Sequence, residues 1–129
     1  MIVILGSNHD DILYFESVMT NKKELQVMNR FPAIKGTIFN QEAILVYDVY
    51  SNYVSSAVTA YLIEKYFVLL VFNVGKCISF TDDLKNGEIV VSKKTYLGNV
   101  LGTHLHEQQD DPIDIVYDIS EYSNTYHNF

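Results

Sequence analysis

The chain has 129 residues, of which 48% are hydrophobic, and its formal net charge is −7. This length and apolar content are typical of one globular domain with a core, so disorder is not the default interpretation. The negative charge disfavours nonspecific binding to nucleic acid or to an anionic membrane, because like charges repel within a Debye length, so we expect neither partner.

The cysteine count and the distribution of apolar residues indicate the compartment. The one cysteine, Cys77, excludes an internal disulfide. The sequence contains neither a basic and apolar signal peptide nor a run of 18 apolar residues. We therefore expect a cytoplasmic protein.

The chain begins with a pattern typical of a strand, a turn and a helix. Residues 1–5 are an apolar run that stops at a glycine, which predicts a short strand. Apolar side chains then recur at helical spacing, which predicts a helix over residues 9–20. Ser7 or Asn8 can cap the first amides of this helix.

The next part of the chain predicts an antiparallel meander. Residues 25–30, 34–39 and 43–49 are rich in β-branched and aromatic side chains and are separated by breaking residues. We expect Asn40 and Gln41 to form the hairpin turn between the second and third of these strands.

Residues 52–66 change to helical spacing and predict a long helix, with Ser51 or Asn52 as its cap. Residues 67–73 are almost entirely apolar, which is typical of a central strand covered on both faces. The strand over 43–49, this helix and the strand over 67–73 would form a right-handed crossover between parallel neighbours. Further strands are expected at 88–92 and after Pro112, where apolar and polar residues alternate.

Together these patterns predict an α/β fold with a mixed, mostly parallel sheet and flanking helices, in a single domain over residues 1–129. The predicted core consists of apolar residues from the strands and from the second helix. Its members are Val3, Leu5, Ile44, Val46, Val58, Leu62, Leu69, Val71, Ile89 and Val91.

Two spaced segments, Val71–Gly75 and Leu84–Ser92, carry a resemblance to the purine nucleoside phosphorylase and nucleosidase family. The order of elements from residue 1 agrees, and the likeness extends to about residue 92. The chain resembles most the first half of the methylthioadenosine/S-adenosylhomocysteine nucleosidases, in which an Asn-Thr-Gly strand end is followed by a Leu-x-x-Gly-Asp-Ile-Val-Val-Ser strand. Residues 93–129 diverge from that pattern.

The resemblance implies a purine nucleoside-type ligand and a site at the ends of the parallel strands. The family's carboxylate that activates water falls on Asp11, although the family has Glu there. The resemblance places the ligand-binding positions at two turns of the family, which fall on residues 48–52 and 75–79, and at the strand end before the second turn. They are Asn73, Gly75, Lys76, Cys77 and Tyr50.

Several departures from the family bear on activity. The turn that approaches phosphate or water through bare backbone falls on residues 48–52, where both glycines are replaced and Asp48 would repel phosphate. The Met-Glu pair that holds ribose and the Asp that protonates the purine have no counterpart, because the sequence has no Met after Met28 and no Ser-Asp dipeptide. Loss of such an acid slows cleavage of the glycosidic bond by about 10²- to 10⁴-fold.

Three functions remain open from the sequence. The first is a catalytically impaired member of the family that binds nucleosides or acts by assembly. The second is an active nucleosidase, cleaving methylthioadenosine or S-adenosylhomocysteine, whose missing groups come from another chain. The third is a metal-dependent or purely structural module that keeps only the fold.

Two other groups of residues in the sequence could form a site. His104 and His106, with acidic residues nearby, could hold a metal, but a solvated acidic loop is the stronger interpretation, so we expect no metal and no cofactor. Cys77 follows Lys76 and could be nucleophilic, although a buried inert thiol is the stronger interpretation. The alternating residues 113–119 either fold back as a substitute strand or pair with their copy in a homodimer, and of the two we expect the homodimer.

Overall fold

The structure is a computed structural model that describes residues 1–79, 82, 84–91, 94–95 and 117–118. Its contacts divide the chain into two compact units, Met1–Ile78 and Ser79–Phe129. The first unit contains two helices and five strands. Their bounds are β1 Ile2–Gly6, α1 His9–Val18, β2 Thr20–Val27, β3 Phe31–Ile38, β4 Gln41–Val46, α2 Asn52–Lys65 and β5 Leu70–Val74.

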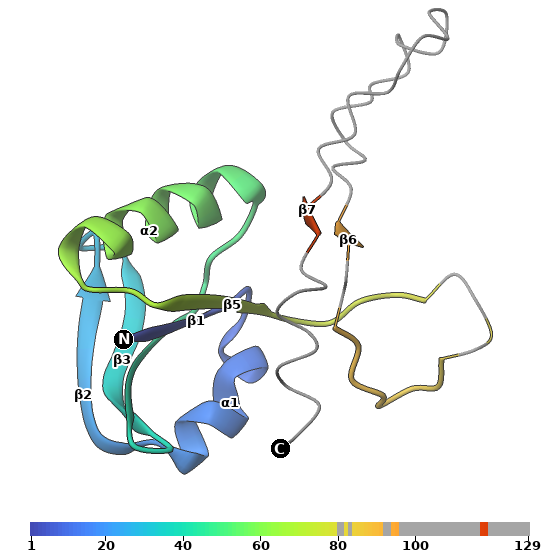
Figure 1. The fold of residues 1–129 in the computed structure, drawn as a ribbon, viewed down its shortest axis with the longest axis horizontal. Helices are drawn as coiled ribbons and strands as arrows, with labels where there is room; N and C mark the ends of the chain where they lie inside the picture. Colours follow the sequence, from blue (N-terminus) through green and yellow to red (C-terminus); the bar gives the residue numbers. More distant parts are fainter. Residues whose placement is uncertain (80–81, 83, 92–93, 96–116, 119–129) are drawn as a thin grey trace, which may run out of the picture. The chain divides into compact units, whose positions relative to one another are not determined.

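The five strands of the first unit form one mixed sheet in the order β2-β3-β4-β1-β5 (Figure 1). β2, β3 and β4 are successive antiparallel neighbours, which confirms the predicted meander. β1 pairs in parallel with β4 on one side and with β5 on the other. β4 and β5 are therefore parallel, but β1 lies between them, so they are not direct neighbours as the crossover prediction had it. The α/β class and the mixed sheet are confirmed.

The hairpin between β3 and β4 turns at Phe39 and Asn40. Both residues have left-handed backbone angles, with φ of 47° and 63°, as a tight two-residue hairpin requires. The predicted turn at Asn40 and Gln41 was one residue too late, because Gln41 already pairs with Ile38 as the first residue of β4.

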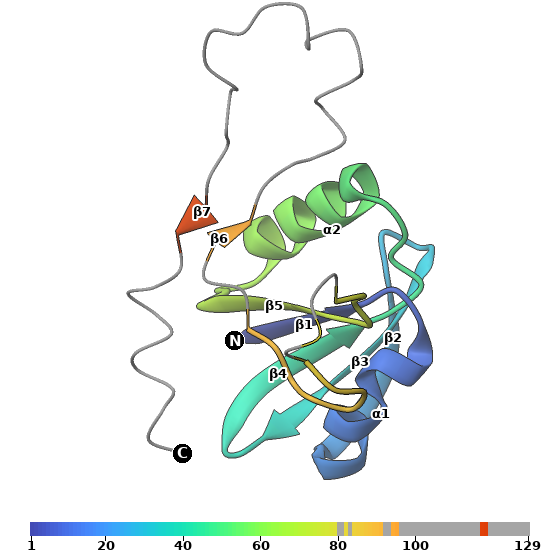
Figure 2. The ribbon, with the colours of Figure 1, turned by 90° about the vertical axis from the view of Figure 1, so that its right-hand side faces the viewer.

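The two predicted helices are confirmed, and they lie on opposite faces of the sheet (Figure 2). Asn8 is the cap of α1, and the backbone N–H of Val54 donates to Ser51 Oγ over 3.5 Å at the start of α2. Of the helices in the described part of the chain, neither is long and apolar enough to cross a membrane.

Alternate residues of the strands supply two separate cores. On the α2 face, odd-numbered residues of β1 pack with even-numbered residues of β4 and with α2. The principal members are Val3, Leu5, Ile44, Val46, Val58 and Leu62. On the α1 face, the opposite residues of the same strands pack with α1 and the end of β3. They are Ile4, Ile12, Met19, Ile34, Ile38, Ala43 and Leu45.

The prediction that residues 67–73 form a central strand is wrong. β5 begins only at Leu70, and it is the last strand of the sheet in the described part of the chain. Phe67 is 84% exposed and Leu69 is 64% exposed, so the first part of the apolar run is surface rather than core. The central strands are β4 and β1, whose apolar residues are almost fully buried.

The predicted strand at 88–92 is also wrong for the residues that the structure describes. Residues 88–91 form neither a strand nor a helix, and both Ile89 and Val91 are exposed. The predicted core therefore loses Leu69, Ile89 and Val91, while Val71 is half-buried. Apolar side chains of an extended segment are buried only when the segment pairs in a sheet that another layer covers, and residues 88–91 are in no such sheet.

The second unit contains a short antiparallel pair, β6 Lys94–Thr95 with β7 Tyr117–Asp118. β7 falls within the strand that the sequence predicts after Pro112. Most of the alternating residues 113–119 lie outside the described residues, and so does the dimer contact predicted from them.

β2, the strand at the other end of the sheet, is charged and irregular. Its register with β3 shifts between Thr20 and Lys23, and Asn21 has a left-handed φ of 53°. The side chains of Lys22, Lys23 and Glu24 are all exposed. Between the pairs that Thr20 and Lys23 form with β3, β2 has one residue more than β3, which is a β-bulge, and the bulge lies in the part of β2 that carries its charges.

Candidate functional site

The candidate site lies where the parallel strands β1, β4 and β5 end. Gly6 is opposite Val74 in the register of β1 with β5, and Leu5 is opposite Val46 in the register of β1 with β4. The loops that follow the three strands therefore start at one edge of the sheet. In open α/β sheets this is the edge where ligands bind.

Asp11 is held at this edge by the start of α1. Its Oδ2 atom accepts a hydrogen bond of 2.9 Å from the backbone N–H of Asn8, and the residue is half-buried. A methyl group placed on Gly75 would lie 3.9 Å from this same oxygen. The structure therefore brings together two residues that are 64 positions apart and that the sequence predicted for the site.

The loop after β4 is tied to the loop after β1. The backbone N–H of Val49 donates to the carbonyl oxygen of Gly6 over 3.3 Å, and the hydroxyl of Tyr50 donates to Asn8 Oδ1 over 3.2 Å. The loop needs left-handed backbone at Asp48 and Ser51, with φ of 61° and 73°. Tyr50 thus reaches the residue that caps α1.

The remaining predicted ligand-binding residues belong to β5 and the segment after it. Asn73 lies in β5 opposite Leu5, and its side chain is exposed. Gly75, Lys76 and Cys77 follow the strand and are exposed as well. The thiol of Cys77 is free and accessible, so the interpretation of a buried thiol is wrong.

A second group of polar residues beside this edge was not predicted as a cluster. His9 Nε2 lies 2.7 Å from Glu16 Oε2, and the His9 ring stacks on Tyr47 with 4.5 Å between ring centres. Burial raises the pKa of Tyr47, and so do the negative charges of Asp48, Glu16 and Glu24. The spacing of His9 and Glu16, two helical turns apart, could have suggested their contact, whereas nothing local indicates the stacking.

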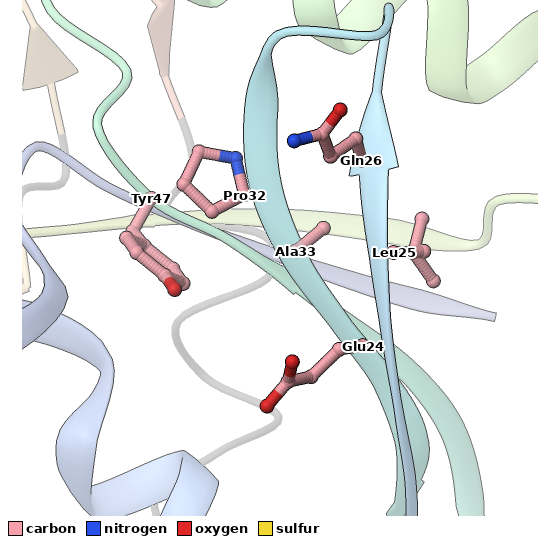
Figure 3. Close-up of a pocket in the computed structure, with 6 residues that line it drawn as sticks. All are labelled: Glu24, Leu25, Gln26, Pro32, Ala33 and Tyr47. Carbon is pink, nitrogen blue, oxygen red and sulfur yellow. The ribbon is translucent and has the colours of Figure 1, made fainter.

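Two of the hollows in the first unit are lined by none of Asp11, Tyr50 and Gly75. One, of about 290 Å³, lies between β2, β3 and Tyr47, and Figure 3 shows the Tyr47 ring and the Glu24 side chain beside it. The other, of about 250 Å³, lies on the α1 face and has mostly apolar walls. Both are smaller than most ligand pockets, which begin near about 300 Å³. At the strand ends themselves, Tyr50, Asn73 and Gly75 are all exposed.

Metal binding has no support in the residues that the structure describes. Within them, no three side chains of His, Cys, Asp or Glu come together in a way that could hold a metal ion. His104 and His106, the two histidines considered for a metal, lie outside the described residues.

The chain resembles known nucleosidases in sequence and in structure, although no protein-family model matches it. It is 29% identical to a 5′-methylthioadenosine/S-adenosylhomocysteine nucleosidase of Shewanella oneidensis over 93 residues, which are 72% of this chain and 39% of the relative. The structure of futalosine hydrolase from Helicobacter pylori is 25% identical and has a TM-score of 0.77, covering 96% of this chain and 54% of that one.

A third match has a ligand. The methylthioadenosine/S-adenosylhomocysteine nucleosidase of Colwellia psychrerythraea in complex with adenine is 23% identical, with a TM-score of 0.67 over 74% of this chain and 39% of that one. The matches cover only 39 to 54% of these relatives, so the chain spans about half of their length.

The described sheet has the fold of the nucleoside phosphorylases and nucleosidases. Within this class, the chain is similar to the amino-terminal part of the methylthioadenosine/S-adenosylhomocysteine nucleosidases. The resemblance that the sequence motifs indicate is therefore confirmed.

Proposed function

We propose that this chain binds a purine nucleoside through one half of a nucleosidase site, and that it does not hydrolyse the nucleoside without groups from elsewhere. The observation that carries the proposal is the approach of Asp11 to Gly75 at the shared ends of β1 and β5. Even a methyl group at this position would meet the carboxylate only at ordinary contact distance, so the space beside Asp11 has room for a ligand. A relative of similar fold binds adenine, which supports a purine as the base.

The residues around this space have distinct roles in the proposal. Asp11 faces the ribose side and directs a water molecule, since its second oxygen can accept a further hydrogen bond. The ring of Tyr50 is 57% exposed and offers a surface for stacking on the base. The exposed side chains of Asn73, Lys76 and Cys77 supply polar contacts around the ligand.

The loop after β4 favours water over phosphate as the second reactant. The N–H of Val49 donates to Gly6 and so does not point toward an anion. The carboxylate of Asp48 would repel phosphate by about 4 kcal/mol at roughly 4 Å with an effective dielectric constant of about 20. We therefore expect no dependence of ligand binding or turnover on phosphate.

The impairment rests on residues that the sequence lacks. The resemblance implies a Met-Glu pair for ribose and a Ser-Asp pair for the purine, and neither pair has a counterpart in these 129 residues. Without an acid for the leaving base, hydrolysis loses about 10²- to 10⁴-fold. Binding needs fewer of these groups than catalysis does, because only catalysis requires the proton transfers.

Titration of methylthioadenosine into the purified chain tests the binding by calorimetry. Wild type is expected to bind, and Gly75→Val should weaken the affinity about tenfold or more by filling the space beside Asp11. Gly75→Ala is the matched control, because its methyl group meets only Asp11 Oδ2, at ordinary contact distance, and it should bind nearly as wild type. Equal affinity in all three proteins would show that the ligand binds elsewhere. No binding by wild type would contradict the proposal.

A second candidate function is hydrolysis completed by another chain, and the anchored carboxylate of Asp11 favours it. Release of adenine from methylthioadenosine, followed by chromatography, separates the two candidates. Any turnover should fall by about 10²- to 10⁴-fold in Asp11→Asn, which keeps an acceptor for the Asn8 N–H but removes the base. Asp10→Asn, at the exposed neighbouring position, should retain it. No adenine from wild type would leave binding as the function.

A further inference from the structure

Asn8 stands between the loop after β4 and the carboxylate of the proposed site. Its side-chain oxygen accepts a hydrogen bond from the Tyr50 hydroxyl over 3.2 Å. Its backbone N–H donates to Asp11 Oδ2 over 2.9 Å. One residue therefore connects a tyrosine that is 42 positions away to the oxygen that faces Gly75.

The end of this connection at Tyr50 is fixed by the fold. Val49, the residue before it, is only 5% exposed, and its backbone N–H donates to the carbonyl oxygen of Gly6 at the end of β1. Tyr50 therefore starts from a backbone that is attached to the centre of the sheet. Asn8, in contrast, is exposed and lies outside the helix with an extended backbone, φ −130° and ψ 164°. The anchored backbone before Tyr50 can thus limit, through the Tyr50 hydroxyl, the movement of Asn8.

We infer that Tyr50 is a positioning residue, whose hydroxyl holds Asn8 so that Asn8 keeps the Asp11 carboxylate directed toward Gly75. The inference rests on the proposed function, since it concerns the same carboxylate, and it adds a role that stacking on a base does not include. A carboxylate at the start of a helix can rotate about two side-chain bonds, so a restrained donor reduces the orientations it samples. The alternative is that the bond from the Tyr50 hydroxyl to Asn8 is an incidental surface contact, which bonds to water replace at no cost.

Exchange of the Asn8 amide proton with solvent, measured by NMR, tests the positioning directly. Tyr50→Phe keeps the ring and removes the hydroxyl, so the Asn8 amide should exchange about three- to tenfold faster. Tyr53→Phe is the matched control, because that side chain is 88% exposed in the first turn of α2, three residues after Tyr50, and it should leave the rate unchanged. The Val49 amide, bonded to Gly6, should keep its rate in both variants.

A double-mutant cycle separates positioning through Asn8 from a general effect of the Tyr50 ring. In Asn8→Ala the acceptor of the hydroxyl is absent, so adding Tyr50→Phe should no longer change the exchange rate of the amide at residue 8. If Tyr50→Phe leaves Asn8 exchange unchanged, or accelerates it equally in both backgrounds, the inference is wrong.

Affinity for methylthioadenosine then distinguishes this inference from the function on which it rests. If wild type binds, Tyr50→Phe should weaken binding about threefold, whereas Tyr53→Phe should not. If wild type binds no nucleoside while Tyr50→Phe still accelerates exchange at Asn8, the proposed function fails and the positioning of Asp11 stands. An affinity that Tyr50→Phe leaves unchanged in a protein that does bind would contradict a role in the site.

Discussion

The two faces of the sheet are built from alternate residues of the same strands, yet among the residues that the structure describes the packing is less complete on the α1 face. On the α2 face, Val58 and Leu62 of the helix and Val3 and Leu5 of β1 are at most 2% exposed. On the α1 face a hollow of about 250 Å³ remains next to buried residues, and Phe39 at its rim is 75% exposed.

Helix length accounts for much of the difference. α2 has 14 residues and α1 has 10, which correspond to roughly 21 Å and 15 Å at 1.5 Å per residue. α1 contributes Ile12 and Phe15 to its face, and the hollow begins beyond Phe15. A pattern of alternating apolar residues thus tells which face a residue belongs to, but it does not tell how much of that face is covered.

The largest effect is expected on the α2 face. Leu62→Ala should lower the free energy of unfolding by about 2 to 5 kcal/mol, because the side chain is fully buried and its loss leaves a closed cavity. Urea unfolding measures the change, and Ile63→Ala is the matched control, since that neighbouring side chain is 55% exposed and should cost well under 1 kcal/mol. Equal costs for the two variants would contradict the packing of α2 on the sheet.

A smaller effect is expected on the α1 face. Ile2 is half-buried and lines the hollow, so Ile2→Ala should cost about 1 kcal/mol, because it removes partly exposed atoms and creates no closed cavity. The same urea measurement applies. A cost as large as that of Leu62→Ala would show that the hollow is filled in solution, and the difference between the two faces would then disappear.

The smallest effect concerns alkaline pH and Tyr47, which borders the α1 face. Burial and the charges of Asp48, Glu16 and Glu24 raise the pKa of Tyr47, so the folded chain holds this proton more tightly than the unfolded chain does. The stability from neutral Tyr47 is complete below about pH 10 and is lost as the pH rises through the raised pKa. Between pH 9 and 11, the urea midpoint should fall less steeply in Tyr47→Phe than in wild type; parallel curves would contradict the shift.

The helices and the meander could be predicted from the sequence because their signals are local. The helical spacing from Val54 to Leu62 and the breaking residue Asn40 depend only on near neighbours. The position of β5 could not be predicted in the same way. A run of apolar residues such as Phe67–Phe72 fits a central strand, but the order of strands depends on pairing with β1, about 70 residues earlier.

The features of the candidate site also differ in how far they could be predicted from the sequence. The prediction that Asp11, Tyr50 and Gly75 lie near one another comes from the family resemblance and from the order of strands, and the structure places all three after strands that end at the same edge of the sheet. The bond from Tyr50 to Asn8 and the stacking of His9 on Tyr47 could not be predicted, since each joins residues about 40 positions apart through their side chains. Such contacts depend on how the loops are placed after the sheet has formed.

The charged, irregular edge at β2 has a consequence for the behaviour of the protein at high concentration. A strand edge with regular spacing can accept a strand from another molecule and begin a fibre. At β2 such an addition would have to accommodate the register shift between Thr20 and Lys23 and bring a second Lys22 and Lys23 close to the first. This end of the sheet is therefore a poor template for the addition of a strand from another molecule.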